Sequence, residues 1–144
     1  ERVELTVGAR SDTASGAPMT LSAVITGRHH GPFEDANATH GGFRVFDGGE
    51  MVGLRCDSGD ALIVTTESLQ PISPEQYRVV GIEPTAMRAI LAKGVNGPRA
   101  GFGPMCSEII EVDTPGITRN SLLGLTYQQR RRPMFPYEPE TTFP

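Results

Sequence analysis

The chain has 144 residues, a formal net charge of −4 and 38% hydrophobic residues. This length suits a single domain with a modest core, and its 17 glycines and 12 prolines indicate many turns. The acidic balance argues against a nucleic-acid partner or an anionic membrane surface. No apolar run approaches the roughly 20 residues that span a bilayer, so we expect neither nucleic acid nor a membrane among the partners.

The two cysteines bear on the cellular location of the domain, and the first residue bears on whether the domain belongs to a longer polypeptide. Cys56 and Cys106 lack the close spacing of metal-binding or redox pairs, and such residues more often serve as small core side chains than as a disulfide. We therefore predict reduced cysteines and a cytoplasmic location. The chain opens on Glu1, already within a strand-like pattern, so we expect it to have been cut from a longer polypeptide.

The first half of the chain has the pattern of an antiparallel sheet. Apolar and polar residues alternate over residues 3–7 and 19–26, which predicts two half-buried strands. Residues 28–42, which contain all three histidines, are predicted to form a loop. Asp-Gly-Gly at 47–49 and Ser-Gly-Asp at 58–60 are predicted hairpin turns, each leading into an apolar strand.

The second half begins with a helix signal. Ser73 can cap a helix over residues 74–80, with Pro74 at its first position and Gln76 at the capping-box position. Gly81 follows this run and is expected to end the helix.

Two further strands and a tail complete the predicted fold. Residues 87–93 and 108–113 are predicted strands, separated by a glycine-rich loop and a one- or two-turn helix from Pro98. Residues 127–144 are rich in proline and are predicted to form an extended tail along the surface, anchored by its aromatic side chains. The fold class is therefore α+β: a mostly antiparallel sheet with one or two short helices, in a single domain over residues 1–126.

The glycine-rich loop "AKGVNGPRAGFGP" carries two cations, Lys93 and Arg99. Lys93 precedes the glycines and no Lys-Ser/Thr pair follows them, so the loop lacks the pattern that binds nucleotide phosphates. Asn96 or Gly97 can instead cap the short helix, and the fork of Arg99 suits a carboxylate. Substrate binding by Lys93, Asn96 and Arg99 and a merely solvated turn are both consistent with this pattern.

The remaining candidate groups give no catalytic centre within this sequence. His29 and His30 are adjacent, which directs their side chains to opposite sides of an extended segment, and His40 completes no metal-binding spacing with them. No nucleophile elbow is present either. Arg10 and Asp12 share the first loop, where they form either a surface ion pair or an arginine presented to a carboxylate.

The order of several segments carries a family resemblance. "VGARSD", "ALIVTTESLQPISPEQYRVVGIEP", "AKGVNGPRAGFGPMCSEIIEVDTPGIT" and "YQQRRRPMFPYE" together resemble the C-terminal domain of the microcystinase C (MlrC)-like metallopeptidase family. The resemblance runs from about Val3 to Glu138. The first loop in this family usually has the pattern Gly-Gly-Lys-x-Asp, whereas here Arg10 stands in place of the lysine and Asp12 is kept.

The resemblance implies that the metal site and this chain belong to different domains of one protein. Family members are two-domain proteins in which a larger N-terminal domain supplies the zinc ligands, and the archetype hydrolyses linear microcystin peptides. We therefore expect zinc in the full-length protein, no metal ligand or catalytic residue in this chain, and no activity from the chain alone. The implied partners are the N-terminal metal-binding domain of the same polypeptide and a small peptide or amide substrate, with a homo-oligomer also possible.

Two functions follow as hypotheses. In the first, the chain is the accessory domain of a zinc-dependent metallopeptidase or amide hydrolase and helps to form its substrate cleft, with Lys93, Asn96, Arg99, Arg10 and Asp12 as substrate-binding residues. In the second, it is a non-catalytic interaction or oligomerisation module.

Overall fold

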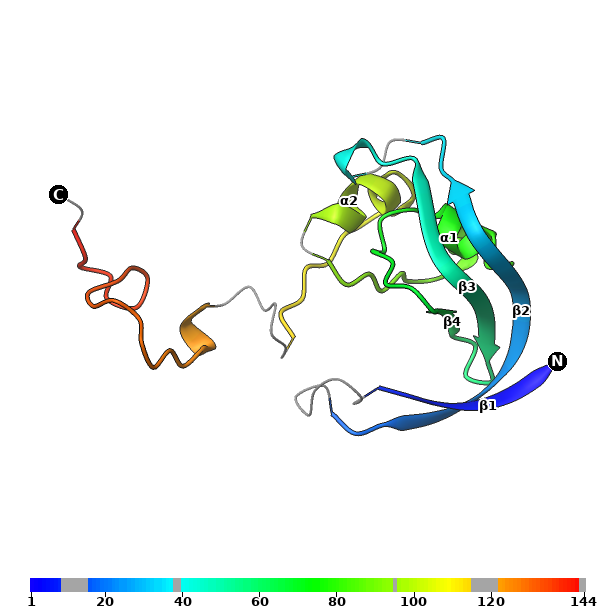
Figure 1. Cartoon of the computed structure of the whole chain (residues 1–144), viewed down its shortest axis with the longest axis horizontal. Coiled ribbons are helices and arrows are strands. Elements are labelled where there is room, and N and C mark those ends of the chain that lie inside the picture. The colour runs from blue at the N-terminus through cyan, green and yellow to red at the C-terminus, as the bar shows by residue number, and fades with distance from the viewer. Residues whose placement is uncertain (9–15, 38–39, 95, 115–121, 143–144) are drawn as a thin grey trace. The chain divides into compact units, whose positions relative to one another are not determined.

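Residues 2–65 contain the strands of an antiparallel sheet (Figure 1). The computed structural model describes residues 1–8, 16–37, 40–94, 96–114 and 122–142. Four strands lie in the sheet in their order along the chain, namely β1 (Arg2–Val7), β2 (Met19–Glu34), β3 (Val45–Cys56) and β4 (Ala61–Thr65). Every neighbouring pair is antiparallel, which confirms the predicted antiparallel sheet.

The helices are few and short. They are α1 (Glu75–Arg78), α2 (Gly97–Phe102) and the 3₁₀ turns η1 (His40–Gly42), η2 (Pro84–Ala86), η3 (Gly103–Met105) and η4 (Leu122–Gly124). The regular secondary structure of the described residues is therefore mostly sheet with small helical pieces, as the predicted fold class requires. No helix among the described residues is long and apolar enough to cross a membrane.

β2 is longer than predicted and contains most of the segment expected to be a loop. Residues 28–34 pair with β3, and the pairing register shifts between Ile25 and Gly27 and again between His30 and Pro32. Gly31 lies within the second shift and has a φ of 78°. The Gly-Pro pair that predicted a loop is thus accommodated as an irregularity inside the strand, and the loop prediction over residues 28–34 was wrong.

One of the two predicted hairpin turns is present. Residues 58–60 connect β3 to β4, with Gly59 at a φ of 93° and the Cys56 N–H donating to the Asp60 carbonyl at 2.8 Å. The predicted turn at residues 47–49 lies inside β3 instead. There the Asp47 carboxylate accepts the Gly49 N–H at 2.8 Å, so the turn signal produces a local irregularity without reversing the chain.

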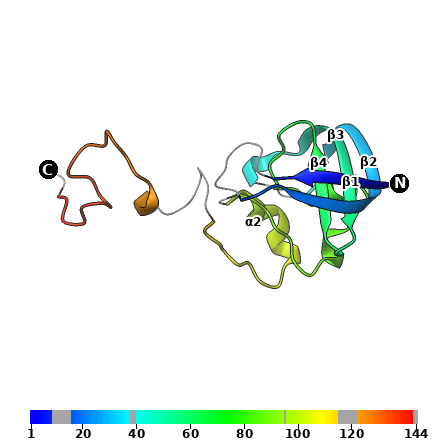
Figure 2. The ribbon, with the colours of Figure 1, turned by 90° about the horizontal axis from the view of Figure 1, so that it is seen from below.

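The larger core lies between the sheet and the segment around α1. Its buried side chains include Phe33, Phe46 and Met51 from β2 and β3, packed with Ile72, Val80 and Ile82. Figure 2 shows the same sheet from a second side. A smaller cluster of Ala23, Leu54 and Cys56 packs elsewhere on the sheet, and both cysteines are free, as predicted.

Two glycines bring Val80 directly onto the sheet. Gly27 and Gly53 are cross-strand partners. A Cβ on Gly27 would lie 2.7 Å from the Val80 carbonyl oxygen, and one on Gly53 would overlap that same oxygen. The Thr26 hydroxyl donates to the Val80 carbonyl at 2.7 Å. The sheet therefore accepts the end of the α1 segment only where side chains are absent.

α1 begins one residue later than predicted, because its N-cap position is Pro74 and not Ser73. The Ser73 hydroxyl accepts the Glu75 N–H at 3.2 Å, while Gly81, at a φ of 77°, follows the helix. Gln76 is buried and its Oε1 has no hydrogen-bond partner among the described residues, so it does not complete a capping box. The helix is shorter than the predicted 74–80.

The predicted strands at residues 87–93 and 108–113 are absent from this fold. Both stretches are irregular, and the sheet ends at β1 on one side and β4 on the other. Alternating residues favour a strand, but a strand forms only where a neighbouring backbone accepts its hydrogen bonds. Among the described residues no strand pairs with either stretch.

The chain divides into two compact units. One comprises Glu1–Val7 with Pro18–Ile110, and the other comprises Gly8–Ala17 with Glu111–Pro144. In the second unit, Arg130 forms an ion pair with Glu138 at 2.5 Å and lies 4.5 Å from the Tyr137 ring centroid. The Tyr127 and Tyr137 rings meet edge to face at 5.8 Å. Anchoring of the tail on the surface of residues 1–126 stays a prediction.

Candidate functional site

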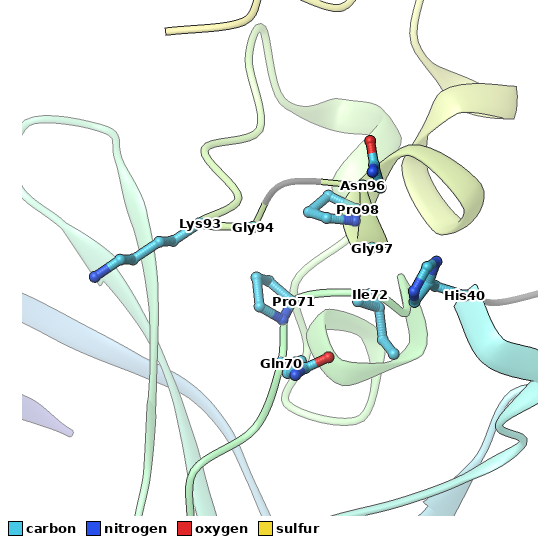
Figure 3. Close-up of a pocket in the computed structure, with 9 residues that line it drawn as sticks. All are labelled: His40, Gln70, Pro71, Ile72, Lys93, Gly94, Asn96, Gly97 and Pro98. Carbon is cyan, nitrogen blue, oxygen red and sulfur yellow. The ribbon is translucent and has the colours of Figure 1, made fainter. Parts of the chain in front are cut away.

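A shallow pocket opens where the predicted glycine-rich loop meets the chain after β4 (Figure 3). Its volume is about 330 Å³. Three separate segments supply its walls: η1, the connection after β4, and the start of α2. The side chains that matter most for its chemistry are His40, Gln70, Pro71, Ile72, Lys93 and Asn96.

The glycines of this loop have a packing role. A Cβ on Gly97 would come within 2.7 Å of the Ile72 Cγ2 atom, and a Cβ on Gly101 would overlap the Ile72 carbonyl oxygen. These two glycines are four residues apart, so they lie on the same face of α2. They let the helix backbone approach the Ile72 segment, and this close approach builds one wall of the pocket.

The pocket combines an apolar floor with a polar rim. Ile72 is buried and Pro71 and Pro98 are half-buried, whereas His40, Gln70 and Lys93 are exposed. Figure 3 shows the Lys93 side chain extending away from Pro71 and Ile72. The ammonium group therefore points away from the apolar floor, and a rotation about the bonds of its long side chain would be needed to bring it to a ligand in the pocket.

Asn96 stands at the N-cap position of α2, as predicted for Asn96 or Gly97. Its side chain makes no capping hydrogen bond, and it lines the pocket. The helix begins at Gly97, one residue before the predicted Pro98. The short helix is thus present, but its first turn is shaped by the Gly-Pro pair and not by an asparagine cap.

The other predicted site residues lie elsewhere. Arg99 is exposed on α2 and is not among the residues lining the pocket, and it has an interaction of its own. Arg10 and Asp12 fall outside the described residues. The structure therefore brings Lys93 and Asn96 together and adds His40 and Gln70, which no local sequence signal assigned to the same pocket.

A second pocket, of about 480 Å³, is lined by Arg78 together with residues that include Asn37, Pro74, Gly101 and Met105. Arg78 is held by two carboxylates, with Glu75 at 2.5 Å and Glu83 at 3.0 Å. The hydrogen bond from Arg78, helped by Thr85, lowers the pKa of Glu83 to about 2. The guanidinium is already satisfied within the fold, so this pocket offers a ligand little charge to bind.

Asp35 is a buried carboxylate that sequence analysis missed. Its Oδ2 accepts the Ser73 hydroxyl at 2.6 Å, and its Oδ1 accepts the Asn37 backbone N–H at 2.8 Å. Burial raises the pKa of Asp35, but these hydrogen bonds outweigh that effect and lower the pKa below its ordinary value of 3.8. The ionised carboxylate links the chain after β2 to the start of α1, which is a structural role.

The three histidines do not form a metal centre. The His29 ring contacts Phe33 and its Nε2 lies 3.0 Å from the Gly31 carbonyl oxygen. His30 pairs with Glu50 at 2.8 Å on the exposed surface. Within the described parts of the chain, no three His, Cys, Asp or Glu side chains are grouped so that they could hold a metal ion. These residues do not fit a zinc site, and we derive no metal-dependent step from them.

Comparison with known proteins identifies the family of this chain. A family model described as the MlrC C-terminus matches residues 1–129, so the chain belongs to that family. A relative described as microcystinase C, from Sphingomonas sp., is 29% identical over 135 residues. The match covers 94% of this chain but 25% of that relative, so the chain spans about a quarter of its length. The family resemblance expected from the sequence is confirmed.

Proposed function

We propose that this chain is the accessory C-terminal domain of a zinc-dependent metallopeptidase or amide hydrolase, and that it forms one wall of the substrate cleft. The zinc and its ligands belong to the part of the polypeptide that precedes this domain. The observation that carries the proposal is the pocket beside α2, where Lys93 and Asn96 stand at the rim of an apolar floor.

The chemistry of this pocket suits part of a peptide. A volume of about 330 Å³ is at the lower end for small-ligand sites. The Ile72 and Pro71 floor favours an apolar side chain, the Asn96 amide can both donate and accept a hydrogen bond, and Lys93 can pair with a carboxylate. A site open on one side needs a second wall, which the preceding domain would provide.

The comparisons support this proposal at the level of the family. The relative's name, microcystinase C, denotes an enzyme, and we extend a hydrolytic role on a small peptide or amide substrate to the full-length protein that contains this chain. The cytoplasmic location is proposed on the same footing, with the two free cysteines as its support. Substrate contacts by Arg99, Arg10 and Asp12 stay predictions.

A second function, a non-catalytic interaction or oligomerisation module, is favoured by one observation. Several large apolar side chains are exposed outside the sheet, among them Leu91 at 91% and Ile110 at 75%. Exposed apolar groups in irregular segments are typical of surfaces that contact another protein. In this alternative the pocket beside α2 has no part in catalysis.

The two functions are separated by comparing the full-length protein with a form that ends before this domain. Zinc content by elemental analysis and hydrolysis of a linear microcystin peptide are measured on both. The proposal predicts that the truncated protein, if it retains zinc, hydrolyses the peptide with a much larger KM or not at all. Equal kcat/KM in the two zinc-loaded forms would contradict a role in the substrate cleft and would favour the interaction module.

A further inference from the structure

Two segments of this chain have the composition of strands but no strand beside them. Residues 88–94 and 107–110 make no backbone hydrogen bond to another described residue. Figure 1 draws both segments without a strand arrow or a helix coil. Their N–H and C=O groups are therefore available to another backbone, as they are at the open edge of a sheet.

The side chains of these segments are also exposed to an unusual degree. Ile110 is 75% exposed and Ile109 is 44% exposed, and the two stand side by side in the sequence. Leu91, in the other segment, is 91% exposed. Each such group left in water forgoes the stabilisation that burial of an aliphatic side chain would give. Successive side chains of an extended segment point to opposite sides, so Ile109 and Ile110 place one apolar group on each side of this unpaired backbone. An unpaired backbone with exposed apolar side chains is what an added extended segment binds.

We infer that residues 107–110 dock the part of the full-length polypeptide that precedes this domain. The microcystinase C relative extends far beyond the match, which covers 25% of its length, and the matching family model is described as a C-terminus. A large stretch of polypeptide is thus tied to this domain at high effective concentration. The inference rests on the proposed function only in placing this domain within a longer protein.

The acidic residues beside the isoleucines argue against a second copy as the occupant. If two copies paired antiparallel about a two-fold axis with Ile109 opposite Ile110, Glu108 of one copy would face Glu111 of the other. Like charges directly opposite each other destabilise a strand pair. An occupant with apolar side chains and a basic residue opposite Glu108 would match this edge, and that description defines the partner segment.

The test is hydrogen–deuterium exchange on the full-length protein, read by peptide fragments that cover residues 107–110 and 88–94. We expect the amides of residues 108–110 to exchange at least about 100-fold more slowly than an unstructured peptide, at every protein concentration. Exchange at the unstructured rate would overturn the inference. Protection that is lost on dilution to the monomer would also overturn it, because the occupant would then be a second copy.

A pair of variants checks the apolar contact. Ile110→Lys in the full-length protein is expected to raise the exchange rate of residues 108–110 by about 10-fold or more. Met19→Lys, which changes a side chain that is 57% exposed at the start of β2, is the matched control and should leave those amides unchanged. Equal, negligible effects of both variants would contradict the inference. Neither readout depends on hydrolytic activity, so an inactive protein with a protected segment would refute the proposed function and leave the docking surface intact.

Discussion

Gly97 of α2 and Ile72 of the chain after β4 lie so close that a Cβ on the glycine would come within 2.7 Å of the Ile72 Cγ2 atom. This close contact explains a glycine at position 97, because any larger side chain there would collide with Ile72. Gly97 and Gly101 leave room for the α2 backbone to lie against the Ile72 segment. This packing forms one wall of the pocket, which Gly97 and Ile72 both line. Lys93 and Asn96 belong to the same loop as Gly97 and line the pocket as well.

The first prediction concerns the helix contact. Gly101→Ala is expected to lower the free energy of unfolding by about 1–3 kcal/mol, because the new methyl group would overlap the Ile72 carbonyl oxygen. Gly103→Ala is the control, since a Cβ there has 3.7 Å to its nearest neighbour, the Ile109 Cδ1 atom. Urea unfolding of the two variants measures the difference. Equal midpoints for both would mean that α2 does not pack on this segment.

The second prediction concerns the buried carboxylate. Asp35→Asn is expected to cost about 1–3 kcal/mol of unfolding free energy, because the Ser73 hydroxyl and the Asn37 N–H both donate to Asp35. Asp60→Asn is the exposed control and should cost under about 0.5 kcal/mol. Thermal unfolding at pH 7 compares the two. If Asp35→Asn lowered the unfolding free energy no more than Asp60→Asn, Asp35 would have no structural role.

The same carboxylate gives a third prediction, for the dependence of stability on pH. The folded pKa of Asp35 is lowered from 3.8, so its contribution is complete above the unfolded pKa and is lost as the pH falls through the lower folded value. Unfolding free energies measured between pH 6 and pH 2 should therefore fall less steeply in Asp35→Asn than in the unaltered protein. Parallel curves would show that Asp35 has an ordinary pKa.

The fourth prediction concerns the second unit. Hydrogen bonds from Arg130, together with the Met134 N–H, lower the pKa of Glu138 to about 2. A titration followed by NMR of the Glu138 side chain should show it ionised down to about that pH. In Arg130→Ala the pKa should return toward its ordinary value of 4.5, whereas Arg131→Ala should leave it lowered. An unchanged pKa in Arg130→Ala would mean that the ion pair does not form in solution.

Alternating apolar and polar residues, together with turn-forming residues, predicted much of the sheet. These signals report the local backbone preference of a segment, and the folded chain keeps that preference in these segments. The strands near residues 3–7 and 19–26, the turn at 58–60 and the short helix after Ser73 all follow from such local signals. The length of β2 did not follow from them, because a glycine and a proline that usually end a strand are absorbed by a shift in register. Whether residues 108–113 pair depends on a neighbour that local sequence does not specify.

The site was predictable in part for the same reason. Lys93 and Asn96 stand in one loop, and their placement at one pocket follows from their spacing. His40 and Gln70 join them only through the folded chain, since they lie more than 20 residues away in sequence. The buried Asp35 was hidden by its position in a segment with the composition of a loop, where an aspartate is ordinarily exposed.

The central claim is that the pocket beside α2 contacts the substrate of a full-length hydrolase. Its most direct test is kcat/KM for a linear microcystin peptide in the zinc-loaded full-length protein, with Lys93→Ala and Asn96→Ala combined. Loss of one charged and one neutral hydrogen bond is expected to lower kcat/KM by about 10- to 100-fold. The control, Arg28→Ala, breaks an exposed ion pair with Glu1 on β2 and should change kcat/KM by less than about 3-fold. An unchanged kcat/KM in the folded double variant would contradict the account.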